Sequence, residues 1–270
     1  MKALDWRFET INSGIRFRDK FFIGLFYFLQ VLTIPFAQIK NFDKFKCFFL
    51  SDVYVQNSAG KFVCRAGSWD LHIVMDEYEK DIRKYFDLKE GIFVDVGAHV
   101  GKYSVMVGNK LKERGKIIAI EPEPNNYRRM MLNASFNRLK NIKGVNVAAS
   151  DKKGRQKFYL SSESRGMGGS SLTRKTNRSI EVETDTLDNI VRSLGLKIEE
   201  IKLIKVDVEG GELEVFKGAK NILKNGNPKI IFESWTPDVR EKNISFLRKF
   251  GYVGKQISQS YSLAEKENQI

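Results

Sequence analysis

The chain has little of the chemistry on which disulfide-rich and metal-binding proteins depend. Its 270 residues include two cysteines, Cys47 and Cys64, and two histidines, His72 and His99. Two cysteines exclude a disulfide-dense scaffold and a four-cysteine zinc site, and two histidines leave little room for a histidine-based metal cluster. With five prolines and 21 glycines, the chain is neither collagen-like nor a proline-rich disordered protein. The sequence therefore predicts a globular protein in a reducing compartment, which we take to be the cytoplasm.

Long apolar runs are absent as well. No stretch of 18 apolar residues is free of charge, so the sequence predicts no transmembrane helix. The most apolar stretch, residues 21–36, contains Gln30 and Thr33, and Pro35 breaks its end. Two interpretations stay open. It is a buried helix that docks onto the main domain, or an interfacial helix that gives peripheral membrane contact through residues 16–46.

Negative charge is scarce relative to positive charge. The 46 Lys and Arg residues outnumber 33 Asp and Glu residues, which gives a net charge of +13. This balance suggests an anionic partner, or simply a basic surface that keeps the protein soluble. Much of the excess lies near the Gly/Ser-rich segment 161–179. We expect this segment to be a loop that faces the substrate or, alternatively, a mobile surface insertion. As a substrate loop it would meet an anionic acceptor through four basic residues: Arg165, Arg174, Lys175 and Arg178.

Apolar strands alternate with helices from Gly91 onward. Residues 1 to about 85 form an expected N-terminal extension, with the apolar helix 21–36 and a short β region. Its expected elements are strands at 60–65 and 70–74 and a helix at 75–86. The main domain, residues 86–270, has expected strands at 92–96, 116–120, 145–149, 156–160, 201–208 and 229–232, and helices at 125–139, 212–223 and 238–250. Such alternation predicts an α/β fold with a mostly parallel, doubly wound sheet.

A glycine turn follows the first of these strands, in the stretch Asp95-Val96-Gly97-Ala98-His99-Val100-Gly101. His99 occupies the position where a dinucleotide-binding turn has its second glycine, and the spacing and residues of a P-loop are missing. A nucleoside cofactor without phosphates remains, and S-adenosylmethionine fits. Gly97 and Gly101 allow its close approach, and we expect Asp95 to lie near its ammonium group.

Polar residues also follow the next strands. Glu121 ends the second strand, where a carboxylate can accept hydrogen bonds from both ribose hydroxyls or, alternatively, precede a helix N-terminus. Ser150 and Asp151 follow the third strand, where they are candidates to bind the adenine amino group or to form a turn.

Two acids at the end of a later strand are the main catalytic candidates. Asp207 and Glu209 lie two residues apart and therefore on one face of the strand. Such a pair can orient an acceptor hydroxyl, act as a base or hold a divalent cation weakly, or it can cap the following helix. Glu233, at the end of the next strand, and His99 are second candidates for the base.

These stretches together resemble the FkbM family of S-adenosylmethionine-dependent methyltransferases. The resemblance spans residues 93–235 and also touches the segment 63–78 upstream. The family more often has Asn at His99 and Ala at Gly211. Its motifs match 95–104, 120–122, 149–154, 169–172, 186–188 and 204–212.

The resemblance implies a Rossmann-like methyltransferase fold and O-methylation of a sugar or natural-product hydroxyl. It implies a cofactor site that includes Asp95, Gly97, Ala98, His99, Gly101, Tyr103, Glu121, Pro122, Ser150, Asp151 and Asp207.

Two other functions stay open on sequence grounds. A nucleic-acid methyltransferase would use the basic charge, but no RNA-binding module and no Pro-Pro-Tyr motif for base-amine methylation is present. A non-catalytic, membrane-associated scaffold would have no physical need for acids at 95, 121 and 207. We therefore expect a small-molecule or glycan acceptor rather than nucleic acid.

Overall fold

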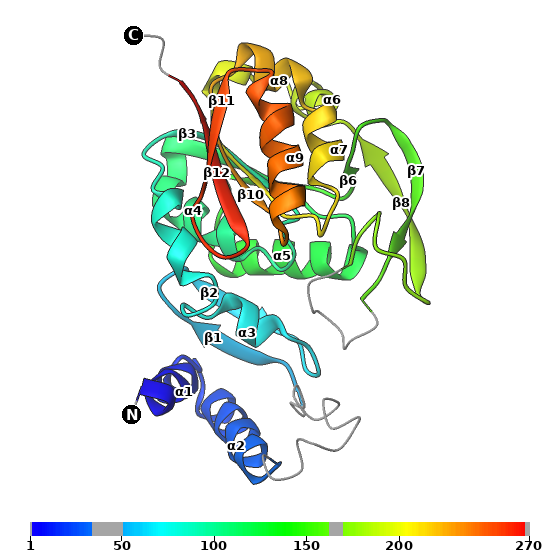
Figure 1. The fold of residues 1–270 in the computed structure, drawn as a ribbon. Coiled ribbons are helices and arrows are strands. Elements are labelled where there is room, and N and C mark those ends of the chain that lie inside the picture. The colour runs from blue at the N-terminus through cyan, green and yellow to red at the C-terminus, as the bar shows by residue number, and fades with distance from the viewer. Residues whose placement is uncertain (1, 34–50, 162–169, 268–270) are drawn as a thin grey trace.

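A computed structural model describes residues 2–33, 51–161 and 170–267 (Figure 1). Its centre is a seven-stranded sheet in the order β11–β12–β10–β9–β3–β4–β5. All neighbours pair in parallel except β12, which runs antiparallel to β10 and β11. This is the mostly parallel, doubly wound sheet that the sequence predicts. The strands are β3 (Gly91–Val96), β4 (Gly115–Ile120), β5 (Ile142–Val145), β9 (Ile201–Val206), β10 (Lys229–Glu233), β11 (Tyr252–Gln256) and β12 (Tyr261–Lys266).

Helices cover both faces of this sheet because its strands are apolar on both sides. Phe93, Ile117 and Leu203 face α4 and α5, while Val94 and Ile118 face the group α6–α9. Figure 1 shows α7 and α9 in front of the sheet. The bounds are α4 (Lys102–Leu111), α5 (Pro124–Phe136), α6 (Leu187–Ser193), α7 (Glu212–Lys217), α8 (Lys220–Asn225) and α9 (Pro237–Arg248), with 3₁₀ turns at Lys112–Arg114 and Ile198–Glu200.

A smaller sheet stands beside the main one. It has the order β6–β8–β7, with β6 (Ala148–Ala149), β7 (Gly154–Tyr159) and β8 (Ser179–Asp185). β7 and β8 form an antiparallel pair that leads into and out of the Gly/Ser-rich segment.

The N-terminal region is bound to the main domain through α5. It comprises α1 (Lys2–Asn12), α2 (Phe17–Thr33), the hairpin β1 (Val53–Gln56) and β2 (Lys61–Cys64), α3 (Asp70–Val74) and a 3₁₀ helix (Lys80–Phe86). The amide of Val63 donates to Asn133 Oδ1 (2.8 Å) and that of Lys61 to Asn137 Oδ1 (2.8 Å).

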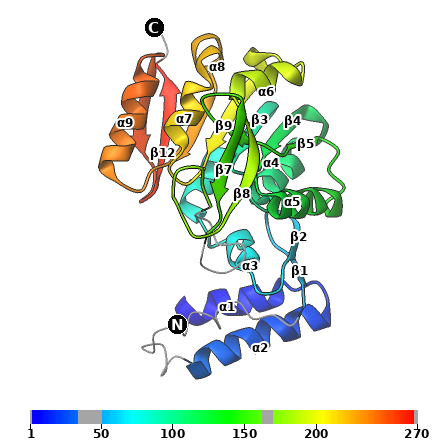
Figure 2. The ribbon, with the colours of Figure 1, turned by 90° about the vertical axis from the view of Figure 1, so that its right-hand side faces the viewer.

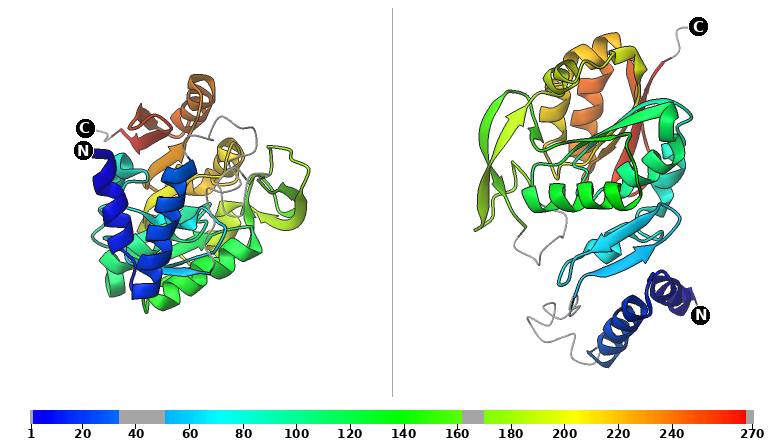
Figure 3. Two further views of the ribbon diagram at one scale, coloured as in Figure 1. Left: turned by 90° about the horizontal axis from the view of Figure 1, so that it is seen from below. Right: turned by 180° about the vertical axis from the view of Figure 1, so that it is seen from behind.

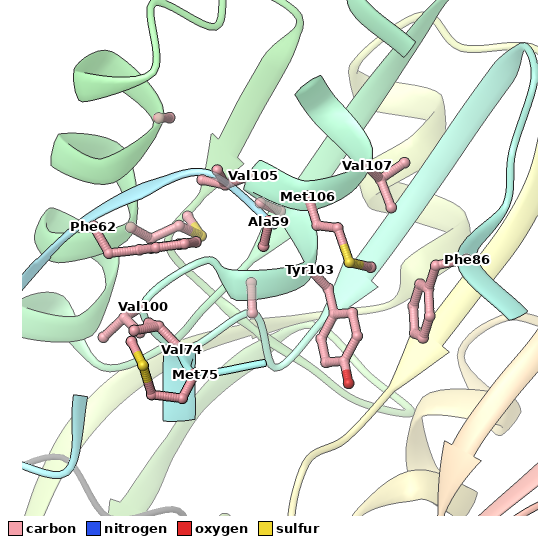
Figure 4. Packing of buried hydrophobic residues seen from close by; sticks show 14 of the residues in the cluster. Ala59, Phe62, Val74, Met75, Phe86, Val100, Tyr103, Val105, Met106 and Val107 are labelled. Atoms are coloured by element: carbon pink, nitrogen blue, oxygen red, sulfur yellow. The ribbon is translucent and has the colours of Figure 1, made fainter. Parts of the chain in front are cut away.

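Side chains from both regions also share one hydrophobic cluster, which Figure 4 shows around Phe62, Val74, Val100 and Tyr103. The division into units 1–85 and 86–270 stays a prediction. None of the helices in the described ranges combines the length and hydrophobicity that crossing a membrane requires.

Four sequence-based elements were wrong or incomplete. The expected strand 70–74 is the short helix α3, because Ser68 Oγ accepts the amide of Asp70 (3.1 Å) and starts a helical turn. The expected helix 75–86 forms only from Lys80, since Glu79 takes a left-handed conformation (φ 56°).

The expected strand 145–149 is divided between β5 and β6, which belong to different sheets. The expected helix 212–223 is interrupted at Gly218, where a Cβ would lie 2.0 Å from the carbonyl oxygen of Ser150. The apolar helix is confirmed as α2, and residues 34–36 of its expected span lie outside the described residues, as does Cys47.

Candidate active site

The candidate active site lies where the central parallel strands end. β4 and β5 lie on one side of β3, and β9 and β10 on the other, so the strand order reverses between β3 and β9. Open α/β sheets bind ligands at such a reversal, beyond the carboxyl ends of the strands. Two pockets open here and share Gly97, Pro122 and Val208, so they form one cleft with two ends.

We call the two ends the acid chamber and the side slot. The acid chamber is lined mainly by Ile73, Tyr78, Glu79, Ala98, His99, Lys102, Tyr103, Glu121, Lys205, Asp207, Glu209, Glu233 and Trp235. The side slot is lined mainly by Ala149, Ser150, Asp151, Leu172, Thr173 and Gly211.

The glycine turn lies against the end of β9. Gly97 has φ 79°, and a Cβ on it would lie 1.8 Å from the carbonyl oxygen of Asp207, so only glycine fits. Gly101 (φ 86°) packs against Met130, where a Cβ would meet Cγ at 2.9 Å. His99 is held at φ 51°, and burial lowers the pKa of its ring. Neither ring nitrogen of His99 has a hydrogen-bond partner among the described residues.

Asp95 lies behind this turn. It is 1% exposed, its Oδ2 accepts a hydrogen bond from Ser104 Oγ (2.6 Å), and burial raises its pKa. It is not among the residues that line the cleft in the described part of the chain. Its second oxygen, Oδ1, has no partner there either. In this position Asp95 fixes the first turn of α4, and its contact with a cofactor ammonium group stays a prediction.

Glu121 is fixed by two backbone amides. Oε2 accepts the amide of His99 (2.8 Å) and Oε1 accepts that of Glu123 (2.9 Å). The side chain of Asn126 also hydrogen-bonds to this carboxylate, whose oxygens have two lone pairs each and so keep capacity for a ligand. Burial raises the pKa of Glu121 to about 7. The protein thus holds this carboxylate in place before any ligand arrives.

Three carboxylates meet in the acid chamber. Asp207, Glu209 and Glu233 place one oxygen each within 4.8 Å of one another. Burial alone would raise the pKa of Asp207, but Lys205 Nζ, 2.7 Å from Oδ2, lowers it. Burial and the negative charge of Asp207 together raise the pKa of Glu233 well above its usual range. At neutral pH, Asp207 is therefore ionised and Glu233 carries a proton.

A phenol connects this cluster to the N-terminal region. The hydroxyl of Tyr261, on β12, lies 2.8 Å from Asp207 Oδ2 and 2.7 Å from Glu79 Oε1. Glu79 Oε2 also accepts a hydrogen bond from Tyr103 (2.8 Å). On the same wall, Lys102 Nζ donates to the carbonyl oxygens of Met75 (3.1 Å) and Tyr78, and burial lowers its pKa to about 8. The segment before the main domain therefore contributes to the acid chamber, through Tyr78 and Glu79.

Sequence reasoning missed Glu79, Lys102, Lys205 and Tyr261. For Lys205 a signal was present, because a lysine inside an apolar strand, two residues before Asp207, lies on the same face as that acid. Glu79 and Tyr261 are 182 residues apart, and nothing local in the sequence relates them.

The predicted site residues divide into two groups. Those at the cleft include every predicted catalytic residue and Ser150, Asp151, Pro122, Ala98 and Tyr103. Arg174, Lys175 and Arg178 are exposed and lie apart from the described lining, whereas Ser170, Leu172 and Thr173 reach it. Arg165 lies outside the described residues.

Comparison with known proteins identifies the family. The description "Methyltransferase FkbM domain" matches residues 95–253, more than half of the chain. The curated methyltransferase sdnD of Sordaria araneosa is 27% identical over 172 residues, which cover 53% of this chain and 66% of that relative. The chain therefore spans slightly less than two thirds of that relative's length.

Solved methyltransferases align more distantly. The methyltransferase FkbM of Methylobacillus flagellatus KT aligns with a TM-score of 0.48 at 12% identity, over 98% of this chain and 59% of that one. The precorrin-6y C5,15-methyltransferase of Geobacter metallireducens GS-15 has a TM-score of 0.47 at 14% identity, over 72% and 91%. The matched domain begins at Asp95 and includes Glu121, Asp207 and Glu233, so the chain belongs to the FkbM methyltransferase family, as its motifs predict.

Proposed function

We propose that the protein transfers the methyl group of S-adenosylmethionine to a hydroxyl of a sugar, glycan or natural-product acceptor. The observation that carries this proposal is the pair of adjoining pockets at the strand reversal, a partly apolar slot beside a chamber with three carboxylates. The proposal extends the family assignment to the reaction and to the acceptor.

The cleft fits the methyl donor in its chemistry. Glu121 offers two fixed oxygens that suit the two ribose hydroxyls. Leu172 and Val208 make part of the side slot apolar, as an adenine ring requires, and we assign Asp151, which lines the same slot, as the acceptor for its amino group. Glu79 and Asp207 give the acid chamber negative charge that favours the positively charged end of the donor.

When bound, S-adenosylmethionine supplies a methyl group activated by a positively charged sulfur. The protein residues then mainly have to position the acceptor. Asp207, held ionised by Lys205, accepts the hydrogen bond that orients the acceptor hydroxyl. We assign Glu209 as the base that takes the hydroxyl proton, while protonated Glu233 donates to Asp207 and keeps the cluster from carrying three negative charges.

Trp235 supports a ring-shaped acceptor. Its side chain lines the acid chamber yet is 66% exposed, so a flat apolar surface lies at the entrance. Aromatic faces of this kind pack against the apolar faces of sugar and polyketide rings. If the acceptor is anionic, we propose that the exposed Arg174, Lys175 and Arg178, with Arg165, attract it. Changing the four residues to Ser should then raise its KM and leave the cofactor affinity unchanged.

A divalent cation is the remaining question at the acid cluster. The three carboxylates lie close enough to hold one, but Lys205 already places a positive charge beside Asp207. We propose that this lysine, which is 3% exposed, makes a cation unnecessary. Activity should therefore persist in excess EDTA, and a loss that Mg²⁺ or Mn²⁺ restores would overturn this assignment.

Calorimetric titration with S-adenosylmethionine and with its demethylated product tests the proposal. We expect micromolar binding of both, weakened in Glu121→Gln. Transfer of a labelled methyl group to a panel of glycans and hydroxylated natural products follows, and Glu209→Gln should lower kcat by about 100-fold or more without changing cofactor binding. Absence of binding to folded protein would reject the methyltransferase function.

A further inference from the structure

The helical hairpin α1–α2 forms the outermost layer of the N-terminal region (Figure 2). In the view from below, both helices lie in front of the rest of the molecule (Figure 3, left). The turn between them is fixed to β1, since the amide of Ile15 donates to the carbonyl of Tyr54 (2.9 Å) and that of Gln56 to Ser13 (2.8 Å). The hairpin is therefore held in a defined orientation.

One face of α2 packs against the rest of the protein. Asp19 and Ile23 are 0% exposed and Tyr27 is 9% exposed, and these positions recur every four residues along one side of the helix. Asp19 is buried inside the hairpin, where its Oδ2 accepts the amide of Arg16 (3.0 Å) and its Oδ1 lies 3.9 Å from the guanidinium of Arg18.

The opposite face of α2 is aromatic and exposed. Phe17 is 87% exposed, Phe21 56% and Phe28 61%. At 100° per residue, these three positions lie within about 40° of one another around the helix axis. Burial would normally remove such side chains from water, and a stripe of this kind marks an interaction surface.

The same exposed side carries positive charge. Arg18 and Lys20 are exposed and flank the first two phenylalanines. Asp19 is the acid of α2 and is buried, so the solvent side of this helix offers only cations. Glu9, on α1, is the exposed acid of the hairpin among residues 7–28, whose side chains are described.

We infer that this face of α2 is an interfacial anchor that binds a lipid bilayer with anionic headgroups. The three phenylalanine rings enter the boundary between headgroups and acyl chains, and Arg18 and Lys20 contact lipid phosphates. The helix lies in the plane of the membrane. A second copy of the chain fits less well, because a symmetric dimer would place the same cations against each other.

Vesicle sedimentation of the full chain tests this inference and needs neither methyl donor nor acceptor. We expect binding to vesicles of phosphatidylcholine with about 30% phosphatidylserine, and weaker binding to phosphatidylcholine alone. High salt should weaken binding to the anionic vesicles several-fold, because it screens the charges. The triple variant Phe17→Ser, Phe21→Ser, Phe28→Ser should lower the partition coefficient by about 100-fold or more.

Matched variants test whether vesicle binding depends on this face of α2 or on exposed apolar and basic residues in general. Leu132, Val239 and Val253 are also exposed, and changing all three to Ser should leave vesicle binding unchanged. Arg18→Glu with Lys20→Glu should weaken binding to anionic vesicles, whereas Lys116→Glu with Lys143→Glu, equal in charge but on exposed positions of the main domain, should weaken it far less. Thermal unfolding of each variant verifies that it is folded.

Any of the following outcomes would overturn the inference. The wild-type protein fails to bind either vesicle, or the phenylalanine variant binds as the wild type does. Alternatively, the wild type does not bind vesicles but self-associates in sedimentation velocity, and the phenylalanine variant stays monomeric. This face would then be a dimer interface. If the wild type does not bind vesicles and the phenylalanine variant unfolds at lower temperature, the face is covered by another part of the chain.

Discussion

The phenol oxygen of Tyr261 lies 2.8 Å from Oδ2 of Asp207, and the two residues come from antiparallel β12 and from the end of β9. The same oxygen lies 2.7 Å from Glu79. A phenol has one proton to donate, so it satisfies one carboxylate fully and the second only if that carboxyl group is itself protonated. Tyr261 therefore connects Glu79, from the segment before the main domain, to Asp207 at the end of β9.

Replacing Tyr261 by Phe tests what this hydroxyl contributes to Asp207. Without the phenol, Asp207 loses a hydrogen bond that lowers its pKa, so the acid limb of the kcat–pH profile should move to higher pH. We expect kcat to fall about tenfold or more and cofactor affinity to change little. Tyr252→Phe is the control, since that hydroxyl is buried without a partner among the described residues. An unchanged acid limb in Tyr261→Phe would show that Asp207 does not depend on the phenol.

The contact between the glycine turn and β9 leads to a second prediction. Gly97→Ala adds a Cβ 1.8 Å from a backbone oxygen and also strains a residue at φ 79°. Gly195→Ala has the strain (φ 63°) but no atom within 4 Å of the new Cβ. Urea unfolding should show a loss of about 1 kcal/mol for Gly195→Ala and at least about 3 kcal/mol for Gly97→Ala. Equal losses would mean that β9 moves away at little cost.

Glu212 should make the protein less stable as pH rises. Its carboxylate accepts the amides of Gly210 (3.0 Å) and Val208 (3.3 Å), yet burial raises its pKa to about 7. A carboxyl group with a folded-state pKa above its unfolded value of about 4.3 binds more protons in the folded state. The free energy of unfolding therefore declines as pH rises from about 4.3 through 7.

Glu212→Gln keeps an acceptor oxygen and removes the charge. We expect this variant to match the wild type near pH 5 and to exceed its unfolding free energy by about 2 kcal/mol near pH 8, as measured by urea unfolding. Glu214→Gln, on the same helix but facing Lys217 at 3.4 Å, should give no such gain. If Glu212→Gln gains nothing at pH 8, the ionised carboxylate is better solvated than its burial indicates.

Ionisation of Glu212 should lower stability, whereas ionisation of Glu121 should strengthen cofactor binding. Its pKa of about 7 means that the carboxylate ionises across the neutral range, and the ribose hydroxyls are better donors to the ionised form. The Kd of S-adenosylmethionine should rise as pH falls below about 7, by up to about tenfold per pH unit. In calorimetry, Glu121→Gln should bind more weakly and without this dependence, while Glu181→Gln, an exposed glutamate of β8, should behave as the wild type does.

The sequence predicts the centre of the fold better than its edges. The central strands β3, β4, β9 and β10 are mostly apolar runs with an acid at or near their ends. Local sequence patterns therefore predict both these strands and the acids Glu121, Asp207 and Glu233. β11 and β12 are as long as these strands but partly polar, and neither was predicted. Tyr261 contacts Asp207, 54 residues away, only because β12 enters the sheet antiparallel beside β10.

The segment before the main domain was misread for a related reason. Asp70 was expected in a strand, but its carboxylate accepts hydrogen bonds from the amide and side chain of Arg65 (2.7–3.0 Å), which compacts the chain into α3. Glu79 adopts positive φ, which few non-glycine residues do, while its carboxylate bonds to two tyrosines of the main domain. Tertiary contacts of this kind leave no periodic pattern in the sequence.

The position of β12 bears on the order in which the protein folds during synthesis. β12 lies between β10 and β11, although the ribosome makes it after both. Until it emerges, β10 presents an open edge to solvent and β11 has no neighbouring strand. Glu79 and Asp207 are translated well before Tyr261, so the nascent chain holds both carboxylates before it holds the phenol that joins them. The β11–β12 hairpin therefore completes the acid chamber as a late step of folding, and a chaperone that shields the β10 edge would act at that stage.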